Sequence, residues 1–233
     1  TVLLFIYTAD IFALLNSDPV VIAHGVPYLQ WMWLSSAFHG ALSAFNGYWN
    51  GTDRPTYYMR VVLLSTFANV PLNYLFMFGA GPIPAFGGEG AGIGTWVASM
   101  LGVAYHVWLA ARHAVPEGFL TRSPTRGDHS LLLRLAVPSS TQMVLESIAL
   151  TAMFRIIGIV GTVELAAYTV LVNLISFVAL PAWGLGTAGA TLVGQALGAQ
   201  SVDDAQRWAW DVIRVGCPLM LLLGVPFWAM PEL

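Results

Sequence analysis

The chain contains no lysine and only one cysteine, and charged residues are scarce throughout its 233 positions. All nine cations are arginines, and charged side chains make up 9% of the residues, against about 25% in soluble proteins. A net charge of -3 without any lysine argues against a basic surface that binds nucleic acid. The single Cys217 cannot form an internal disulfide and has no second thiol for a metal site, so we expect it to be a packing residue.

Hydrophobic side chains, in contrast, make up 57% of the sequence. Stretches without any charge cover residues 19–52, 61–88, 90–111 and 165–202. Each stretch is long enough to cross a bilayer, because a spanning helix needs about 20 apolar residues. This composition excludes a soluble enzyme and predicts an all-α, polytopic helical bundle in the membrane.

Turn and breaker residues divide the apolar runs into one partial helix and six full spans. We predict the partial helix near residues 1–15 and the full spans near residues 20–50, 56–79, 91–112, 131–157, 165–199 and 203–230. The sequence begins without a methionine or a signal peptide and closes directly after an apolar run. We therefore expect an internal piece of a longer membrane protein.

The arginines orient these spans, because cytoplasmic loops collect arginine and lysine. Arginines in alternate loops share one side of the membrane, and those on this side are Arg54, Arg60, Arg112, Arg122, Arg126, Arg134, Arg207 and Arg214. Only Arg155 lies on the opposite side. The polar segment 113–130 is thus predicted to be a cytoplasmic linker between two bundles, residues 1–112 and 131–233, of a multi-pass protein of the cell membrane.

Glu146 is the only charged residue in the 20-residue stretch 135–154 and lies near its middle. A carboxylate at this depth is costly, and such residues usually face a protein interior or a water-filled cavity and take part in ion or proton movement. Ser139 and Gln142 precede it by seven and four residues and therefore share its helical face. The pattern predicts a functional carboxylate; the alternative is a neutral, hydrogen-bonded carboxyl group.

Asn69 and Asn73 lie one helical turn apart, with Pro71 between them. Proline frees one backbone carbonyl, so this segment can offer several oxygens to a small hard cation, or its amides can simply bond neighbouring helices. Thr169, Asn173 and Ser176 form a similar polar stripe, for which helix bonding is the favoured interpretation unless the stripe faces the cavity. The five histidines form no metal-binding motif.

Several segments resemble, in the same order, the multidrug and toxic compound extrusion (MATE) family. They are Tyr28-Leu-Gln-Trp31, Asn46-Gly-Tyr-Trp-Asn-Gly-Thr-Asp-Arg-Pro55, Asn69-Val-Pro-Leu-Asn-Tyr74, Gly87-Gly-Glu-Gly-Ala-Gly-Ile-Gly-Thr95, Leu133-Arg-Leu-Ala-Val-Pro138 and Val193-Gly-Gln-Ala-Leu-Gly-Ala199. The resemblance implies about half of a two-lobe, twelve-helix transporter. Residues 1–112 would be the end of helix 3 and helices 4–6, and residues 131–233 would be helices 7–9.

The resemblance also implies a function. Members of this family are antiporters that export organic cations or drugs in exchange for sodium ions or protons, with no cofactor apart from the coupling ion. We expect alternating access, with the substrate bound between the lobes near the bilayer midplane. Partners would be small organic cations and the lipid bilayer, and the full-length protein would be a monomer.

Particular residues match the functional positions of the family. Glu146 matches a helix 7 glutamate that contributes to a cation site in the second lobe. Asn69, Asn73 and Thr95 match the helix 5 amides and helix 6 threonine of a cation site in the first lobe. Residues expected to line the substrate cavity are Ser139, Gln142, Thr169 and Asn173. Sodium at the cation-binding residues is the only metal expected, and the choice between sodium and proton stays open.

Two other functions compete with drug export. A flippase for lipid-linked saccharides, with a related fold, would be expected to carry more cationic side chains in its cavity, whereas Arg155 is the only cation outside the predicted cytoplasmic loops and helix ends. An intramembrane enzyme would need clustered catalytic groups, and only one ionisable residue lies at the centre of a predicted span.

Overall fold

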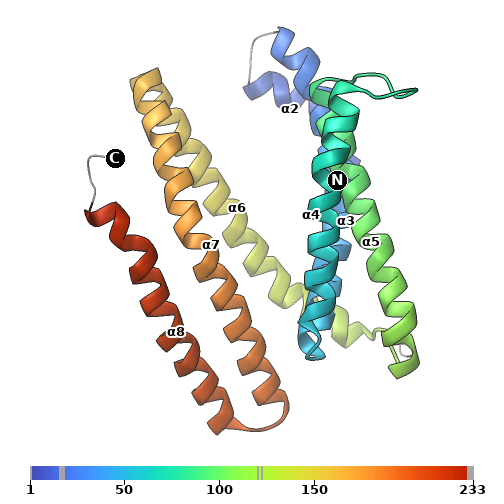
Figure 1. Ribbon diagram of the computed structural model, residues 1–233, viewed down its shortest axis with the longest axis vertical. Helices are drawn as coiled ribbons and strands as arrows, with labels where there is room; N and C mark the ends of the chain where they lie inside the picture. The colour runs from blue at the N-terminus through green and yellow to red at the C-terminus, as the bar shows by residue number, and fades with distance from the viewer. Residues whose placement is uncertain (1, 16–18, 120, 122, 230–233) are drawn as a thin grey trace. The chain divides into compact units, whose positions relative to one another are not determined.

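The computed structural model describes residues 2–15, 19–119, 121 and 123–229, and its regular elements are helices (Figure 1). The helices are α1 (Val2–Ile6), α2 (Thr8–Leu15), α3 (Pro19–Gly51), α4 (Pro55–Phe78), α5 (Gly88–Leu109), α6 (Arg126–Val160), α7 (Thr162–Gly198) and α8 (Val202–Ala229). Among the described residues, extended pairing is limited to one isolated bridge between Ala80 and Ile83. The predicted all-α class is therefore confirmed.

By length and composition, five helical segments of the described chain can cross a membrane: Pro55–Phe78, Gly88–Glu117, Arg126–Val160, Thr162–Gly198 and Val202–Val225. The sequence predicted six full spans. The difference is α3, which has 33 residues and is about 50 Å long, enough to cross a membrane. Its mean hydropathy is lower than that of the five helical segments because it contains histidine, glutamine, asparagine and several tryptophans.

The predicted partial helix near residues 1–15 is divided at Tyr7 into α1 and α2. Thr8 is almost completely buried, and its hydroxyl donates to the carbonyl oxygens of Leu4 and Phe5 at 2.7 and 2.9 Å. A threonine hydroxyl that bonds back to the preceding turn often bends a helix. This local hydrogen bonding accounts for the division.

The described chain forms two compact units, residues 1–122 and 123–233. In unit 1, α5 packs against both α3 and α4 (Figure 1). The buried residues of α5 are Gly90, Gly92, Ile93, Gly94, Ala98, Ser99, Gly102, His106 and Leu109. Most of them are glycine, alanine or serine. Small side chains allow helix axes to approach closely, as in membrane helix interfaces. Helix α5 is therefore the centre of unit 1.

Unit 2 contains α6, α7 and α8, with α7 packed against both of the others. Its described side chains are mostly exposed, and the buried residues are Gly189, Ala196 and Ala205. An apolar groove of about 950 Å³ lies between α7 and α8, lined by residues that include Leu185, Val212 and Cys217. Cys217 is an exposed free thiol at this groove.

The predicted linker, residues 113–130, is partly helical. After α5 the chain continues through a π-helical turn, Ala110–Ala114, and a 3-10 turn, Val115–Glu117. Helix α6 begins at Arg126 because Thr125 and Asp128 form a capping box, in which each side chain bonds the backbone N–H of the other. Between Glu117 and Arg126, the described residues 118, 119, 121 and 123–125 belong to no helix.

Candidate functional site

Asn69, Asn73 and Thr95, the predicted first-lobe residues, lie together between α4 and α5. The Nδ2 group of Asn73 donates to Oδ1 of Asn69 at 3.0 Å, and Nδ2 of Asn69 donates to Oγ1 of Thr95 at 3.3 Å. The Thr95 hydroxyl in turn donates to the carbonyl of Ala91, one turn earlier in α5, at 2.9 Å. All three side chains are half-buried, so the structure places them within the helix interface of unit 1.

One oxygen of this cluster lacks a partner. Oδ1 of Asn73 is buried and accepts no hydrogen bond, although a buried acceptor without a partner is costly. Asn73 is held against α5 because Gly94 has no side chain, and a β-carbon there would lie 2.8 Å from the backbone nitrogen of Asn73. Pro71, inside the same helix, has no N–H to donate to the carbonyl of Phe67. The cluster therefore combines a hydrogen-bonded chain with a free amide oxygen, which is suited to a cation or to a hydrogen-bond donor.

The second predicted group lies on α6 in unit 2. Ser139, Gln142 and Glu146 are all exposed at the surface of this unit. The Ser139 hydroxyl donates to the carbonyl of Leu135 at 3.0 Å and is satisfied within its own helix. Among the described residues, no ion pair involves Glu146. Within unit 2, this carboxylate is thus open to a cation.

The polar stripe on α7 has a similar character. Thr169 and Asn173 are exposed, and the Thr169 hydroxyl donates to the carbonyl of Leu165 at 2.8 Å. Ser176 likewise donates to the carbonyl of Val172 at 2.7 Å. In unit 2 these hydroxyls therefore bond to their own helix, whereas helix-to-helix bonding was the interpretation favoured from the sequence.

Clusters of acidic, histidine and cysteine side chains with the geometry of a metal site do not occur in the described part of the chain. The oxygens of Asn69, Asn73 and Thr95 are neutral amide and hydroxyl groups. Such a set fits a weakly bound monovalent cation better than a transition metal, which prefers imidazole or thiolate ligands.

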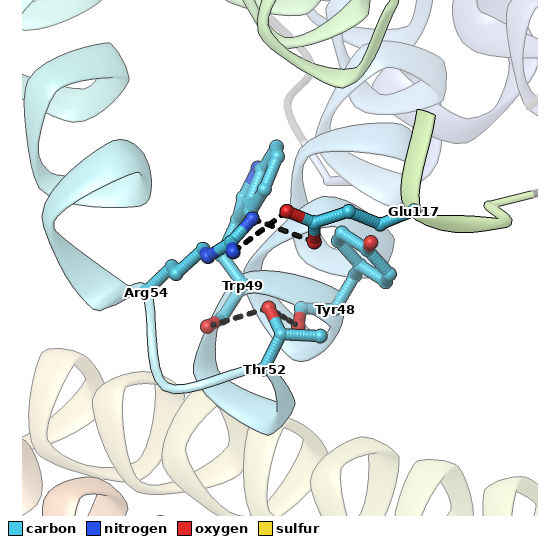
Figure 2. A network of polar contacts seen from close by, with 5 residues as sticks. All are labelled: Tyr48, Trp49, Thr52, Arg54 and Glu117. Carbon is cyan, nitrogen blue, oxygen red and sulfur yellow. Dashed lines mark hydrogen bonds and ion pairs between the residues drawn. The ribbon is translucent and has the colours of Figure 1, made fainter. Parts of the chain in front are cut away.

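A network of polar contacts that the sequence did not predict joins the loop after α3 to the segment after α5 (Figure 2). The two terminal guanidinium nitrogens of Arg54, Nη1 and Nη2, donate to Oε2 and Oε1 of Glu117, each at 2.8 Å. Hydrogen bonding to Glu117 raises the pKa of Arg54 above its usual value. Next to this pair, Thr52 donates to the carbonyl of Tyr48 at 3.0 Å. The bidentate geometry fixes Glu117, the last residue of the 3-10 turn, to the α3–α4 loop.

A buried aromatic core adjoins this network through Trp49. The indole Nε1 of Trp49 donates to Nδ1 of His106 at 3.2 Å, and both side chains are completely buried. The His106 ring stacks on Phe45 with a centroid distance of 4.9 Å, and Tyr57 stacks on His113 at 5.0 Å. His113 was predicted to start the linker, but it packs on unit 1.

Reversing the charges of the Arg54–Glu117 pair tests whether it holds these two segments together. Arg54→Glu and Glu117→Arg should each lower the melting temperature, because each places like charges side by side. The loss should be no more than about 4 °C, since exposed ion pairs contribute little. Combining both changes should restore most of the loss in a thermal unfolding assay. If the double variant is no more stable than the single variants, the contact is not made in solution.

The five long apolar helices define the chain as a multi-pass membrane protein. A comparison with protein-family models matches the MatE family over residues 1–75 and 138–233, more than half of the chain. The chain therefore belongs to the MatE family, the multidrug and toxic compound extrusion family that its motifs resemble.

Curated relatives extend this finding. The chain is 26% identical to the probable multidrug resistance protein NorM of Mesorhizobium japonicum, in a match that covers 94% of this chain and 48% of the relative. It is 29% identical to the probable multidrug resistance protein YoeA of Bacillus subtilis, over 94% of this chain and 48% of the relative. The chain thus spans about half the length of these two relatives.

A solved structure confirms the fold. The crystal structure of MATE in the bent conformation superposes with a TM-score of 0.81 at 18% sequence identity. The match covers 97% of this chain and 50% of the solved chain. The prediction of about half of a MATE-type transporter is confirmed, because both the sequence relatives and the solved structure are about twice as long.

Proposed function

We propose that this chain serves in a secondary antiporter that exports organic cations or drugs in exchange for sodium ions or protons. The observation that carries the proposal is membership of the MatE family, together with relatives that are named as multidrug resistance proteins. The polar groups of α4–α5 and α6 supply positions at which a coupling ion can bind.

The first-lobe position is the cluster of Asn69, Asn73 and Thr95. A small cation at Oδ1 of Asn73 would satisfy the one buried oxygen that has no partner in the described structure. None of the three side chains ionises between pH 5 and 9, so this cluster favours a metal cation over a proton. The second-lobe position is Glu146, which can hold either ion because its carboxylate can bind sodium or take up a proton.

The substrate would lie against the polar side chains of α6 and α7, namely Ser139, Gln142, Thr169 and Asn173. The amides of Gln142 and Asn173 are exposed in unit 2 and have both donors and acceptors to offer. The hydroxyls of Ser139 and Thr169 already donate hydrogen bonds to carbonyl oxygens of their own helices. Towards a substrate they would therefore act as acceptors.

Alternating access would expose these substrate-binding side chains to each side of the membrane in turn. The arginines of the α3–α4 loop and of the segment after α5 support a cytoplasmic location for this end of unit 1 and for the linker, residues 113–130. Binding of the coupling ion and of the organic cation would then be mutually exclusive, because each is favoured by a different arrangement of the same helices.

Transport of a fluorescent cation tests the proposal. The intact protein is reconstituted in liposomes that are loaded with ethidium, and a sodium or proton gradient is imposed in separate experiments. One of the two gradients should drive ethidium movement, and an ionophore that collapses that gradient should stop it. The size of each gradient is measured in the same experiment. Protein-free liposomes under the same gradients serve as the control.

The same vesicles distinguish the flippase. A flippase would move a fluorescent lipid-linked saccharide between leaflets, whereas an exporter of the proposed kind would leave it in place. Saccharide movement without any gradient-driven ethidium flux would contradict the proposal, and so would the absence of ethidium flux under both gradients.

A further inference from the structure

Glu89 is a carboxylate in unit 1 to which neither proposed ion site assigns a role. It lies in the first turn of α5 and is half-buried. One of its oxygens, Oε1, accepts a hydrogen bond from the indole Nε1 of Trp31 in α3 at 2.9 Å. None of the ion pairs of the described residues involves Glu89. The carboxylate therefore has no described cationic side chain paired with it.

The arginines of unit 1 are too far away to neutralise Glu89. Arg112 lies beyond the other end of α5, about 35 Å away at 1.5 Å per residue. Arg54 is bound to Glu117 at that same end. Arg60 lies over the ring of Tyr57, which itself stacks on His113. The described cations of unit 1 are thus grouped at one end, and Glu89 is at the opposite end.

Further aromatic rings adjoin Trp31, the residue that binds this carboxylate. Trp96 follows Glu89 by two helical turns, so both side chains lie on the same face of α5. The Trp31 ring is 5.4 Å from the Trp96 ring and tilted by 56°, and Phe38 meets Trp96 edge-on at 6.3 Å. All three rings are half-buried, so part of their surface is open.

The backbone fixes Trp31 in this position. Gly92 lies on the face of α5 that meets α3, between the turns of Glu89 and Trp96. A β-carbon on Gly92 would be 2.9 Å from Cβ of Trp31 and 3.0 Å from the carbonyl oxygen of Tyr28. Trp31 therefore reaches both Glu89 and Trp96 because the two helices approach closely at Gly92.

A carboxylate beside partly exposed indole rings is the chemistry that binds organic cations. The aromatic faces attract the cation and its apolar substituents, and the carboxylate neutralises the charge. A hard inorganic cation would instead need several oxygen ligands, and the described part of the chain has no group of three or more acidic, histidine or cysteine side chains that could hold a metal ion. The geometry thus favours an organic cation over a metal ion.

We propose that Glu89, Trp31 and Trp96 form a subsite for the organic cation, and that Glu89 selects for positive charge. The subsite rests on the proposed export function and is separate from Asn69–Asn73–Thr95 and from Glu146. The competing explanation is structural: a carboxylate in the first turn of a helix is stabilised by the helix dipole, and here it also accepts a hydrogen bond from Trp31.

Glu89→Gln separates the two explanations. Glutamine keeps the Oε1 acceptor for Trp31 but removes the charge. The variant should bind radiolabelled tetraphenylphosphonium at least about tenfold more weakly, because loss of the charge pair removes about 1.4 kcal/mol of binding free energy. Binding of the neutral analogue triphenylphosphine oxide should not change, and the melting temperature should stay within about 2 °C of the wild type.

The matched control is Glu164→Gln. Glu164 is a carboxylate in the first turn of α7 and is exposed. This change should leave tetraphenylphosphonium binding unaltered. A second variant, Trp96→Leu, should weaken binding of the cation by removing an aromatic face, while Glu89 keeps its hydrogen bond to Trp31.

The outcomes distinguish this subsite from the proposed function. If the wild-type protein exports ethidium and Glu89→Gln binds tetraphenylphosphonium as tightly as the wild type, the subsite is wrong and export stands. If Glu89→Gln loses thermal stability with no change in binding, the residue is structural. If the wild type neither transports ethidium nor binds tetraphenylphosphonium, both proposals fail.

Discussion

Glu146→Gln is expected to reduce ion-driven efflux of ethidium to the level of protein-free liposomes, a loss of more than about tenfold. Glu146 is the only charged residue in the 20-residue stretch 135–154. In unit 2 it is exposed on α6, and no ion pair to another described residue compensates its charge. A glutamine of the same size can neither release a proton nor neutralise a sodium ion, so it cannot couple the gradient to export.

Two further measurements make this expectation specific. Glu146→Asp keeps the carboxylate and should retain part of the efflux. Glu164→Gln removes a carboxylate from the first turn of α7 and should transport at the wild-type rate. The amount of each variant in the membrane is measured by immunoblotting, so that a loss of protein is not mistaken for a loss of coupling. Wild-type efflux from Glu146→Gln would exclude Glu146 as the coupling residue.

The helix positions could be predicted from the sequence because helix-breaking residues mark helix ends locally. Helix α4 was predicted at residues 56–79 and spans Pro55–Phe78, with Pro55 in its first turn. Helix α7 was predicted at residues 165–199 and spans Thr162–Gly198. Helix α6 begins five residues earlier than predicted, because the capping box of Thr125 and Asp128 was not recognised among the polar residues of the expected linker.

The contacts between helices were harder to predict. Asn69 and Asn73 stand one turn apart in the same helix, so their pairing is visible in the sequence. The partner of Asn69 in α5, Thr95, was identified only through the family resemblance. The Trp31–Glu89, Trp49–His106 and Arg54–Glu117 contacts join residues that are 58, 57 and 63 positions apart. Such pairs depend on which helix faces approach one another, and no periodic pattern in one sequence records this.

The structure gives Gly94, in α5, a packing role. Its missing side chain leaves room for α4, since a β-carbon would be 2.8 Å from the backbone nitrogen and 2.9 Å from Cα of Asn73, and would also meet Oδ1 of Asn73. Backbone atoms cannot move aside as a flexible side chain can. The close approach of α4 and α5 therefore depends on this position.

Gly94→Ala is accordingly expected to destabilise unit 1 by about 1–3 kcal/mol, the usual cost of overpacking. The melting temperature should fall by about 3–10 °C in a thermal unfolding assay. Displacement of Asn73 should also break its 3.0 Å hydrogen bond to Asn69 and weaken any ion bound at the cluster. The loss should appear despite the better helix propensity of alanine, which by itself would stabilise the helix by about 1 kcal/mol.

Gly102→Ala, in the same helix, is the matched control. A β-carbon there would lie 3.4 Å from side-chain atoms of Leu42 and Ser65, which can shift slightly, so this change should be neutral or stabilising. Adding Asn73→Ala to Gly94→Ala should not restore stability, because the backbone nitrogen and Cα of residue 73 remain in the way. If Gly94→Ala is as stable as Gly102→Ala, α4 and α5 do not approach this closely, and Asn69 and Thr95 are too far apart to share one ion.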